Sequence, residues 1–132
     1  MSSRREFLKF LSTLPLVGIA KIEKTREGTR YLLHECFVAG FRFHQGPALL
    51  SRMGVGTALE ITAEPDNSYD PFAVRLDYNG AQIGYLPKSQ NQVISRLLQQ
   101  GAPIECHIAR IDKDAPPWQA VTVQVSILFK GE

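Results

Sequence analysis

Alternating apolar and polar residues along most of the chain predict a protein built mainly of short β-strands. In the run from Phe72 to Asp77 every second residue is apolar, so Phe72, Val74 and Leu76 should share the buried face of one strand. Comparable runs predict strands at residues 35–43, 57–63, 82–86, 104–109 and 121–127. This pattern predicts a mainly β domain.

Three local signals modify this pattern. Asn79-Gly80 stands between two predicted strands and indicates a tight hairpin, because a type I′ turn needs positive φ at both central residues. Gly84 should mark a bulge or a close approach of two backbone segments. Residues 89–100 have the apolar spacing of a short helix, with Ser89 as the expected N-cap. We expect this helix to cover one end of the strands.

The stretch from Glu64 to Pro71 (E-P-D-N-S-Y-D-P) is dense in turn-forming residues. Its prolines fix φ, and its Asp, Asn and Ser side chains can bond their own backbone. Tyr69 stands in this loop with no apolar neighbour on either side. Rigid loops on a scaffold often carry sites, but turns rich in Asn and Asp are also common in plain structural hairpins. These residues alone leave both interpretations open.

Three motifs in the chain resemble the HIRAN domain family, a module that is found beside helicase domains and also alone in bacteria. They are G-F-R-F-H at residues 40–44, E-P-D-N-S-Y-D-P-F-A-V at residues 64–74 and N-G-A-Q-I-G-Y-L-P at residues 79–87. The resemblance covers roughly residues 36–129, and its N-x-Y-D-x-x-A core is long and specific. It implies a mainly β fold with one or two short helices, in the form of a small β-barrel related to the OB-fold.

The resemblance also implies a non-catalytic site for nucleic acid, in particular the 3′ end of single-stranded DNA. Tyr69 or Phe43 could stack on a base. Lys88 and Arg42 could meet phosphate, and an ionised Asp70 could accept a hydrogen bond from a free 3′ hydroxyl. The same carboxylate would repel an interior phosphate, which would distinguish an end from a continuous strand. Matched to the family motifs, the site comprises Arg42, Phe43, His44, Asp66, Asn67, Tyr69, Asp70, Tyr85 and Lys88.

Three of these positions depart from the pattern of the DNA-binding eukaryotic members. His44 stands where those members tend to have a second aromatic residue, and Tyr85 replaces a histidine. Asp66 replaces an asparagine, which adds a negative charge beside the turn.

The first twenty residues have the pattern of a twin-arginine export signal. Ser3-Arg4-Arg5-Glu6-Phe7-Leu8-Lys9 precedes an apolar segment, residues 10–19, that is too short for a stable membrane anchor. Small residues in Gly18-Ile19-Ala20 suit a signal peptidase, so cleavage before Lys21 and a periplasmic or exported location are expected. The alternative is an uncleaved amphipathic helix on a cytoplasmic protein. The expected organisation is a signal segment at 1–20, a linker at 21–34 that could end in a strand at residues 31–33, and a HIRAN-like barrel at 35–130.

The net charge of +2 is unevenly distributed along the chain. Residues 1–35 carry seven Lys and Arg against four Glu, whereas residues 36–132 carry eight against nine acidic residues. A groove that tracks a nucleic-acid backbone needs clustered positive charge. Any nucleic-acid contact of the barrel should therefore be confined to a small local site.

Familiar catalytic and metal-binding patterns are absent from the sequence. It holds no Walker-type glycine loop, no nucleophile turn and no paired metal-ligand spacing, and its three histidines are scattered. We therefore expect no enzyme activity, no cofactor and no metal. Cys36 and Cys106 should be buried thiols, or a disulfide if the protein is exported. Trp118, the only tryptophan, should either cap the core or extend the binding surface.

Three functions fit these observations. The protein could bind single-stranded nucleic-acid ends in the cytoplasm, or it could be exported and use the same pocket for a peptide or an envelope component. It could also be exported and meet extracellular DNA.

Overall fold

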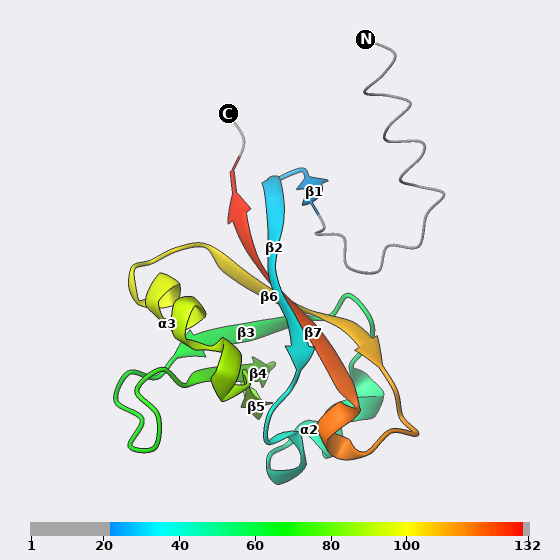
Figure 1. Ribbon diagram of the computed structural model, residues 1–132. Coiled ribbons are helices and arrows are strands. Elements are labelled where there is room, and N and C mark those ends of the chain that lie inside the picture. Colours follow the sequence, from blue (N-terminus) through cyan, green and yellow to red (C-terminus); the bar gives the residue numbers. More distant parts are fainter. Residues whose placement is uncertain (1–21, 131–132) are drawn as a thin grey trace.

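The computed structural model describes residues 22–130, so the expected export signal lies outside the described residues. Within this range the chain forms strands and short helices in the arrangement of Figure 1. The strands are β1 (Ile22–Thr25), β2 (Gly28–Phe37), β3 (Ala58–Ala63), β4 (Val74–Tyr78), β5 (Ala81–Tyr85), β6 (Ile104–Ile111) and β7 (Val121–Phe129). The α-helices are α2 (Gly46–Leu49) and α3 (Gln92–Gln99), and the 3₁₀ helices are η1 (Phe41–Phe43), η2 (Leu50–Arg52), η3 (Lys88–Gln90) and η4 (Pro117–Gln119).

The strands of residues 22–130 form one antiparallel seven-stranded sheet that curls back on itself. Their order is β1-β2-β7-β6-β3-β4-β5, and β2 and β7 are the long strands that cross the centre of Figure 1. The two sides of the sheet meet where Ala39, just after β2, exchanges backbone hydrogen bonds of 2.8 and 2.9 Å with Tyr85 of β5. A mainly β, barrel-like fold with short helices is therefore confirmed.

Gly84 permits this meeting of the two sides. Its φ is 154°, and a Cβ atom at this position would collide with the carbonyl oxygen of Ala39. The register of β4 and β5 also shifts between Leu76 and Asp77. Both a close approach and a bulge therefore occur here, as the sequence indicated. Asn79 and Gly80 have φ values of 47° and 82°, which confirms the tight hairpin.

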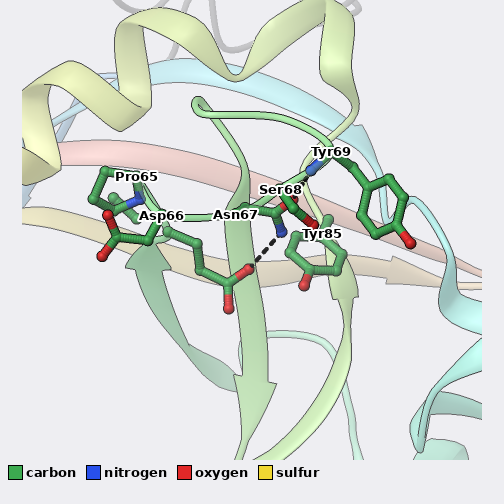
Figure 2. Close-up of a pocket in the computed structure, with 8 residues that line it drawn as sticks. Pro65, Asp66, Asn67, Ser68, Tyr69 and Tyr85 are labelled. Atoms are coloured by element: carbon green, nitrogen blue, oxygen red, sulfur yellow. Dashed lines mark hydrogen bonds between the residues drawn. The ribbon is translucent and has the colours of Figure 1, made fainter.

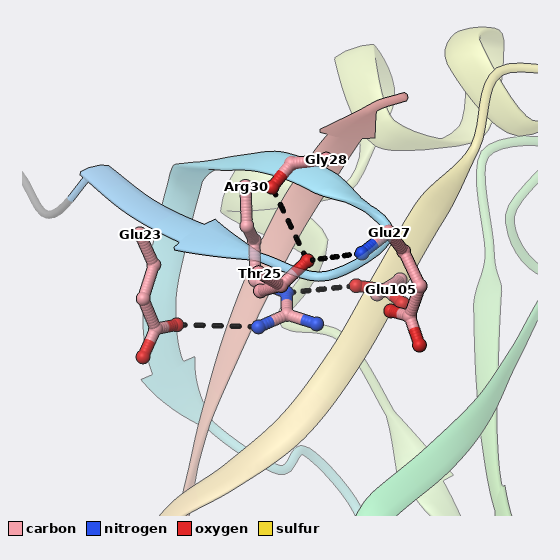
Figure 3. A network of polar contacts seen from close by, with 6 residues as sticks. All are labelled: Glu23, Thr25, Glu27, Gly28, Arg30 and Glu105. Carbon is pink, nitrogen blue, oxygen red and sulfur yellow. Dashed lines mark hydrogen bonds and ion pairs between the residues drawn. The ribbon is translucent and has the colours of Figure 1, made fainter. Parts of the chain in front are cut away.

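The expected linker at residues 21–34 is wrong for its described part, because β1 and most of β2 lie there. The many charged residues of this stretch are typical of a solvent-exposed linker, so the sequence did not indicate two complete strands here. The Arg30 guanidinium reaches across β7, donating to Glu105 on β6 at 2.8 Å and to Glu23 on β1 at 3.2 Å (Figure 3). Arg30 thus ties the first hairpin to the rest of the sheet.

The strand expected at residues 35–43 is also shorter than the alternation suggested. Strand β2 ends at Phe37, and Gly40 with φ 70° turns the chain into η1. This turn buries Phe41 in the core. Phe72, expected in a strand, instead lies half-buried in the turn before β4, with its ring 5.4 Å from the guanidinium carbon of Arg96.

Helix α3 begins later than the sequence suggested. Ser89, the expected N-cap, lies in η3, and Asn91 occupies the N-cap position of α3. The helix buries Ile94 and Ser95, whereas Val93 of the expected apolar stripe is exposed.

Both cysteines are buried, free thiols. Strand β7 lies between them, because Cys36 on β2 pairs with Val123 and Cys106 on β6 pairs with Val125. Two strand spacings of about 4.8 Å separate the cysteine backbones by roughly 10 Å, beyond the limit of about 7 Å for a disulfide. The disulfide hypothesis is therefore wrong for this structure. Trp118 is 59% exposed and does not cap the core.

No helix within residues 22–130 is long and apolar enough to cross a membrane. In the same range no three His, Cys, Asp or Glu side chains come together as a metal site would need.

Candidate functional site

The turn between β3 and β4 is held by the side chain of Asn67. Its Oδ1 accepts hydrogen bonds from the backbone N–H groups of Tyr69 at 2.9 Å and Asp70 at 3.1 Å. Its Nδ2 donates to Oε1 of Glu64 at 3.1 Å, the dashed line in Figure 2. Asn67 therefore acts as an internal brace that presents the Tyr69 ring and the Asp70 carboxylate. The brace explains why the sequence needs an asparagine here: one side chain must both accept and donate.

The carboxylate of Asp70 is fixed through both oxygens. Oδ1 accepts from the backbone N–H of Phe72 at 2.9 Å, and Oδ2 accepts from Nδ2 of Asn91 at 2.8 Å. The hydrogen bond from Phe72, then that from Asn91, holds the pKa of Asp70 below its usual range, and the charge of Lys88 adds to this effect. Asp70 is therefore an ionised, oriented acceptor at neutral pH.

These groups meet in a pocket of about 420 Å³, which we call the turn pocket. Five of the nine residues predicted from the sequence line it, namely Asn67, Tyr69, Asp70, Tyr85 and Lys88. The other lining residues are Ala39, Ala73, Leu86 and Asn91. The turn pocket thus combines a fixed carboxylate, a lysine and two tyrosines over an apolar floor.

A second pocket of about 570 Å³, which we call the acidic pocket, lies against the same turn. It shares Asn67, Tyr69 and Tyr85 with the turn pocket and adds the carboxylates of Glu64 and Asp66 (Figure 2). Its other lining residues are Ala63, Pro65 and Ser68. Burial raises the pKa of the Tyr85 hydroxyl, and the nearby Glu64 carboxylate raises it further.

The remaining predicted residues flank these pockets without lining them. Arg42 and Phe43 lie on η1, with the Arg42 guanidinium carbon 5.8 Å from the centroid of the Phe43 ring. The Phe43 ring is 80% exposed. His44 packs edge-to-face on Tyr85, with 5.8 Å between ring centroids. The predicted residues therefore form one connected surface from η1 to the turn.

Sequence reasoning missed two residues of this site. Asn91 is 3% exposed, and it was overlooked because Ser89 offered a plausible N-cap. Asn91 makes no side-chain capping bond, since its amide is used on Asp70. Glu64 was interpreted only as part of a turn. Its place three residues before Asn67 was the available indication that its carboxylate could accept a hydrogen bond from that asparagine.

Comparisons with known proteins agree with the fold. A protein of Lactobacillus plantarum solved by a structural genomics consortium has 26% identity and a TM-score of 0.65, covering 75% of this chain and 95% of its own. The HIRAN domain of human HLTF has 19% identity and a TM-score of 0.58, covering 80% of this chain and 84% of its own, and so shares the fold. No curated protein matched the chain. The model of the HIRAN domain matches residues 31–130, and the chain belongs to the HIRAN domain family.

Proposed function

We propose that this protein is a non-catalytic nucleic-acid-binding module that recognises the free 3′ hydroxyl end of single-stranded DNA. One observation carries the proposal: the turn pocket places the fixed, ionised carboxylate of Asp70 beside Lys88 and two tyrosines. Membership of the family and the fold shared with the HLTF domain support it.

Asp70 would read the end of the strand. A carboxylate can only accept hydrogen bonds when ionised, so a terminal hydroxyl can donate to it. A phosphate at the same place would bring two negative charges together in a partly desolvated pocket, which is unfavourable. Lys88, exposed on the rim of the pocket, would meet the phosphate that precedes the terminal sugar.

Tyr69 and Phe43 would supply stacking surfaces. Tyr69 and Phe43 are 92% and 80% exposed, so both rings are open to a stacking partner. Base–aromatic stacking contributes about 1–3 kcal/mol per base and tolerates any sequence. The two rings lie on different segments, the turn and η1, so successive bases could use them in turn.

The state of Asp70 also argues against its acting as a general base. An efficient general base has a pKa near the working pH. The hydrogen bonds from Phe72 and Asn91 move the pKa of Asp70 in the opposite direction, downward. Asp70 therefore suits binding and is a poor acceptor for a transferred proton at neutral pH.

Fluorescence anisotropy tests the proposal directly. The probe is a short labelled single strand, either with a free 3′ hydroxyl or with a 3′ phosphate. We expect binding of the hydroxyl strand only, and we expect Asp70→Asn to reduce the difference between the two. Equal binding of both strands would remove end recognition while leaving nucleic-acid binding in place.

Absence of binding to either strand would favour the second candidate, an exported module with a non-DNA ligand. The twin-arginine pattern of residues 1–20 is the observation behind that candidate. A peptide or an envelope component would then be the class of ligand to test next.

A further inference from the structure

We propose that the acidic pocket reads the base of the terminal nucleotide, and that Glu64 gives it a preference for cytosine over uracil and thymine. This inference rests on the proposed function, because it assumes that the terminal sugar lies at Asp70. It adds a specificity-determining residue that stacking and end recognition do not supply.

The two pockets are placed so that one nucleotide can occupy both. They share Asn67, Tyr69 and Tyr85, so the terminal sugar and its base can lie on either side of the same turn. Two tyrosine side chains line both spaces, which offers the base aromatic and apolar surface. A nucleotide whose sugar hydroxyl bonds Asp70 would therefore direct its base edge toward the acidic pocket.

Glu64 is an oriented acceptor within that pocket. Its backbone N–H donates to the carbonyl of Ala73 at 2.8 Å, and its Oε1 is held by Asn67 at 3.1 Å. Its Oε2 forms a loose ion pair with Nη1 of Arg75 at 4.0 Å, a separation too long for a hydrogen bond. Arg75 is engaged elsewhere, since its Nε donates to Asp77 at 2.7 Å. The Glu64 carboxylate has about four acceptor sites, so capacity remains beside Asn67 and the neighbouring Tyr85 hydroxyl.

The charge of the pocket selects a base over a phosphate. Glu64 and Asp66 both contribute negative charge to its lining, whereas Lys88 lines only the turn pocket. A phosphate would be repelled from the acidic pocket and attracted toward Lys88. The sugar-phosphate backbone should therefore pass the turn pocket and leave the acidic pocket to the base.

The same carboxylate distinguishes one pyrimidine from another. Cytosine presents an exocyclic amino group, a donor that Glu and Asp accept in known complexes. Uracil and thymine present a carbonyl oxygen at that position, which would face the Glu64 carboxylate as a second acceptor. A terminal cytosine would gain a charge-assisted hydrogen bond to Glu64, whereas a terminal uracil or thymine would be repelled by it. Cytosine should therefore be preferred.

The test uses the whole protein and strands that differ only in the terminal base. Labelled strands ending in cytosine, uracil or thymine with a free 3′ hydroxyl are titrated by anisotropy. We expect cytosine to bind about tenfold more tightly than uracil, a ratio typical of one hydrogen bond to a charged group. Uracil and thymine should be similar, which separates the amino group from the effect of the thymine methyl.

Two matched variants assign the preference to its residue. In Glu64→Gln the ratio of cytosine to uracil affinity should fall to about one. In Glu60→Gln the ratio should stay unchanged, since Glu60 lies on β3, the strand that leads to Glu64, and accepts from the N–H of Gly80 at 2.8 Å, outside the pocket. A merely structural role for Glu64 would weaken all strands equally and leave the ratio intact.

The outcomes separate this inference from the proposed function. Tight binding of all three strands with equal affinity overturns the base preference and leaves end recognition standing. A cytosine preference that survives Glu64→Gln overturns the role of Glu64. If no strand binds, the proposed function fails and the base preference fails with it. Because the wild-type ratio is informative by itself, poor folding of Glu64→Gln would not block the test.

Discussion

Asn91 shows how a buried residue can set the properties of a site through the carboxylate that it orients. It donates to Asp70 from the start of α3, so the helix and the turn are joined at this point. In Asn91→Ala one of the two anchoring bonds is lost, and the pKa of Asp70 should rise toward its ordinary value of about 3.9. We expect weaker binding of the 3′ hydroxyl strand and a fall in affinity that begins at higher pH than in the wild type.

The sign of this effect follows from the direction of the shift. A carboxyl group with a lowered pKa stays ionised above that pKa, and it loses both its acceptor role and its contribution to stability as the pH falls through it. Anisotropy titrations from pH 7 down to about pH 3, which is below the ordinary pKa of an Asp side chain, would show the difference. Gln92→Ala, which changes the adjacent exposed residue of α3, is the control. An identical pH profile in Asn91→Ala would contradict the role of Asn91.

Tyr69 allows a simpler measurement at the same scale. Its side chain is 92% exposed, so replacement by alanine should leave the thermal midpoint nearly unchanged. If a base stacks on it, Tyr69→Ala should cost about 1–3 kcal/mol of affinity. The matched control is Tyr31→Ala, an exposed tyrosine on β2 at the far end of the sheet. Loss of affinity in both variants would mean a general effect of aromatic removal.

The elements of this fold were predictable where local chemistry decided them. Asn79-Gly80 needs positive φ at two residues, and that requirement is visible in the sequence. The end of β2 was not visible, because Phe41 is buried by the turn at Gly40 and not by strand alternation. The first hairpin was missed for a related reason. Arg30 is charged, yet its partners Glu23 and Glu105 lie on other strands, so only the folded chain explains it.

In the site too, residues fixed by local chemistry were predictable from the sequence, and residues placed by contacts between distant elements were not. Tyr69 and Asp70 could be named from motif residues, since a short turn fixes their relative positions through Asn67. Asn91 could not, because it is brought to Asp70 by the packing of α3 twenty-one residues later. The alternation of apolar residues and the turn-forming residues do not indicate which distant elements come into contact.

Cys36 on β2 and Cys106 on β6 are buried, so their thiols should react slowly in the folded protein. Burial raises the pKa of Cys36 to about 11, and burial raises the pKa of Cys106 as well. Little thiolate therefore forms at pH 8, and thiolate is the reactive species. We expect iodoacetamide to leave the native protein unmodified by mass and to add two groups in denaturant. Rapid alkylation of the native protein would mean that β2 or β6 opens readily.

For the whole molecule, the expected export signal leads to a prediction about the mature chain. The twin-arginine pattern and the small residues before Lys21 lead us to expect cleavage at that bond. The intact mass of protein recovered from a host with twin-arginine export should then correspond to a chain that starts at Lys21. Arg5→Lys weakens the signal conservatively and serves as the control. An intact Met1 terminus in the exported fraction would contradict cleavage.

The charge of the whole domain sets how binding should depend on salt. Residues 36–132 carry eight basic and nine acidic side chains, so any attraction to phosphate must come from a few local cations, chiefly Lys88 and Arg42. For single strands the logarithm of affinity falls with the logarithm of salt concentration with a slope of about −0.7 per phosphate neutralised. One or two contacts therefore predict a slope between about −0.7 and −1.4, or roughly a threefold to sevenfold loss between 50 and 200 mM salt. Lys88→Gln should bring the slope closer to zero, whereas Lys24→Gln, an exposed position on β1 at the opposite edge of the strand order from β5, should leave it unchanged. A slope several times steeper would mean a long electrostatic track along the strand, which a domain with balanced charge and small local pockets does not offer.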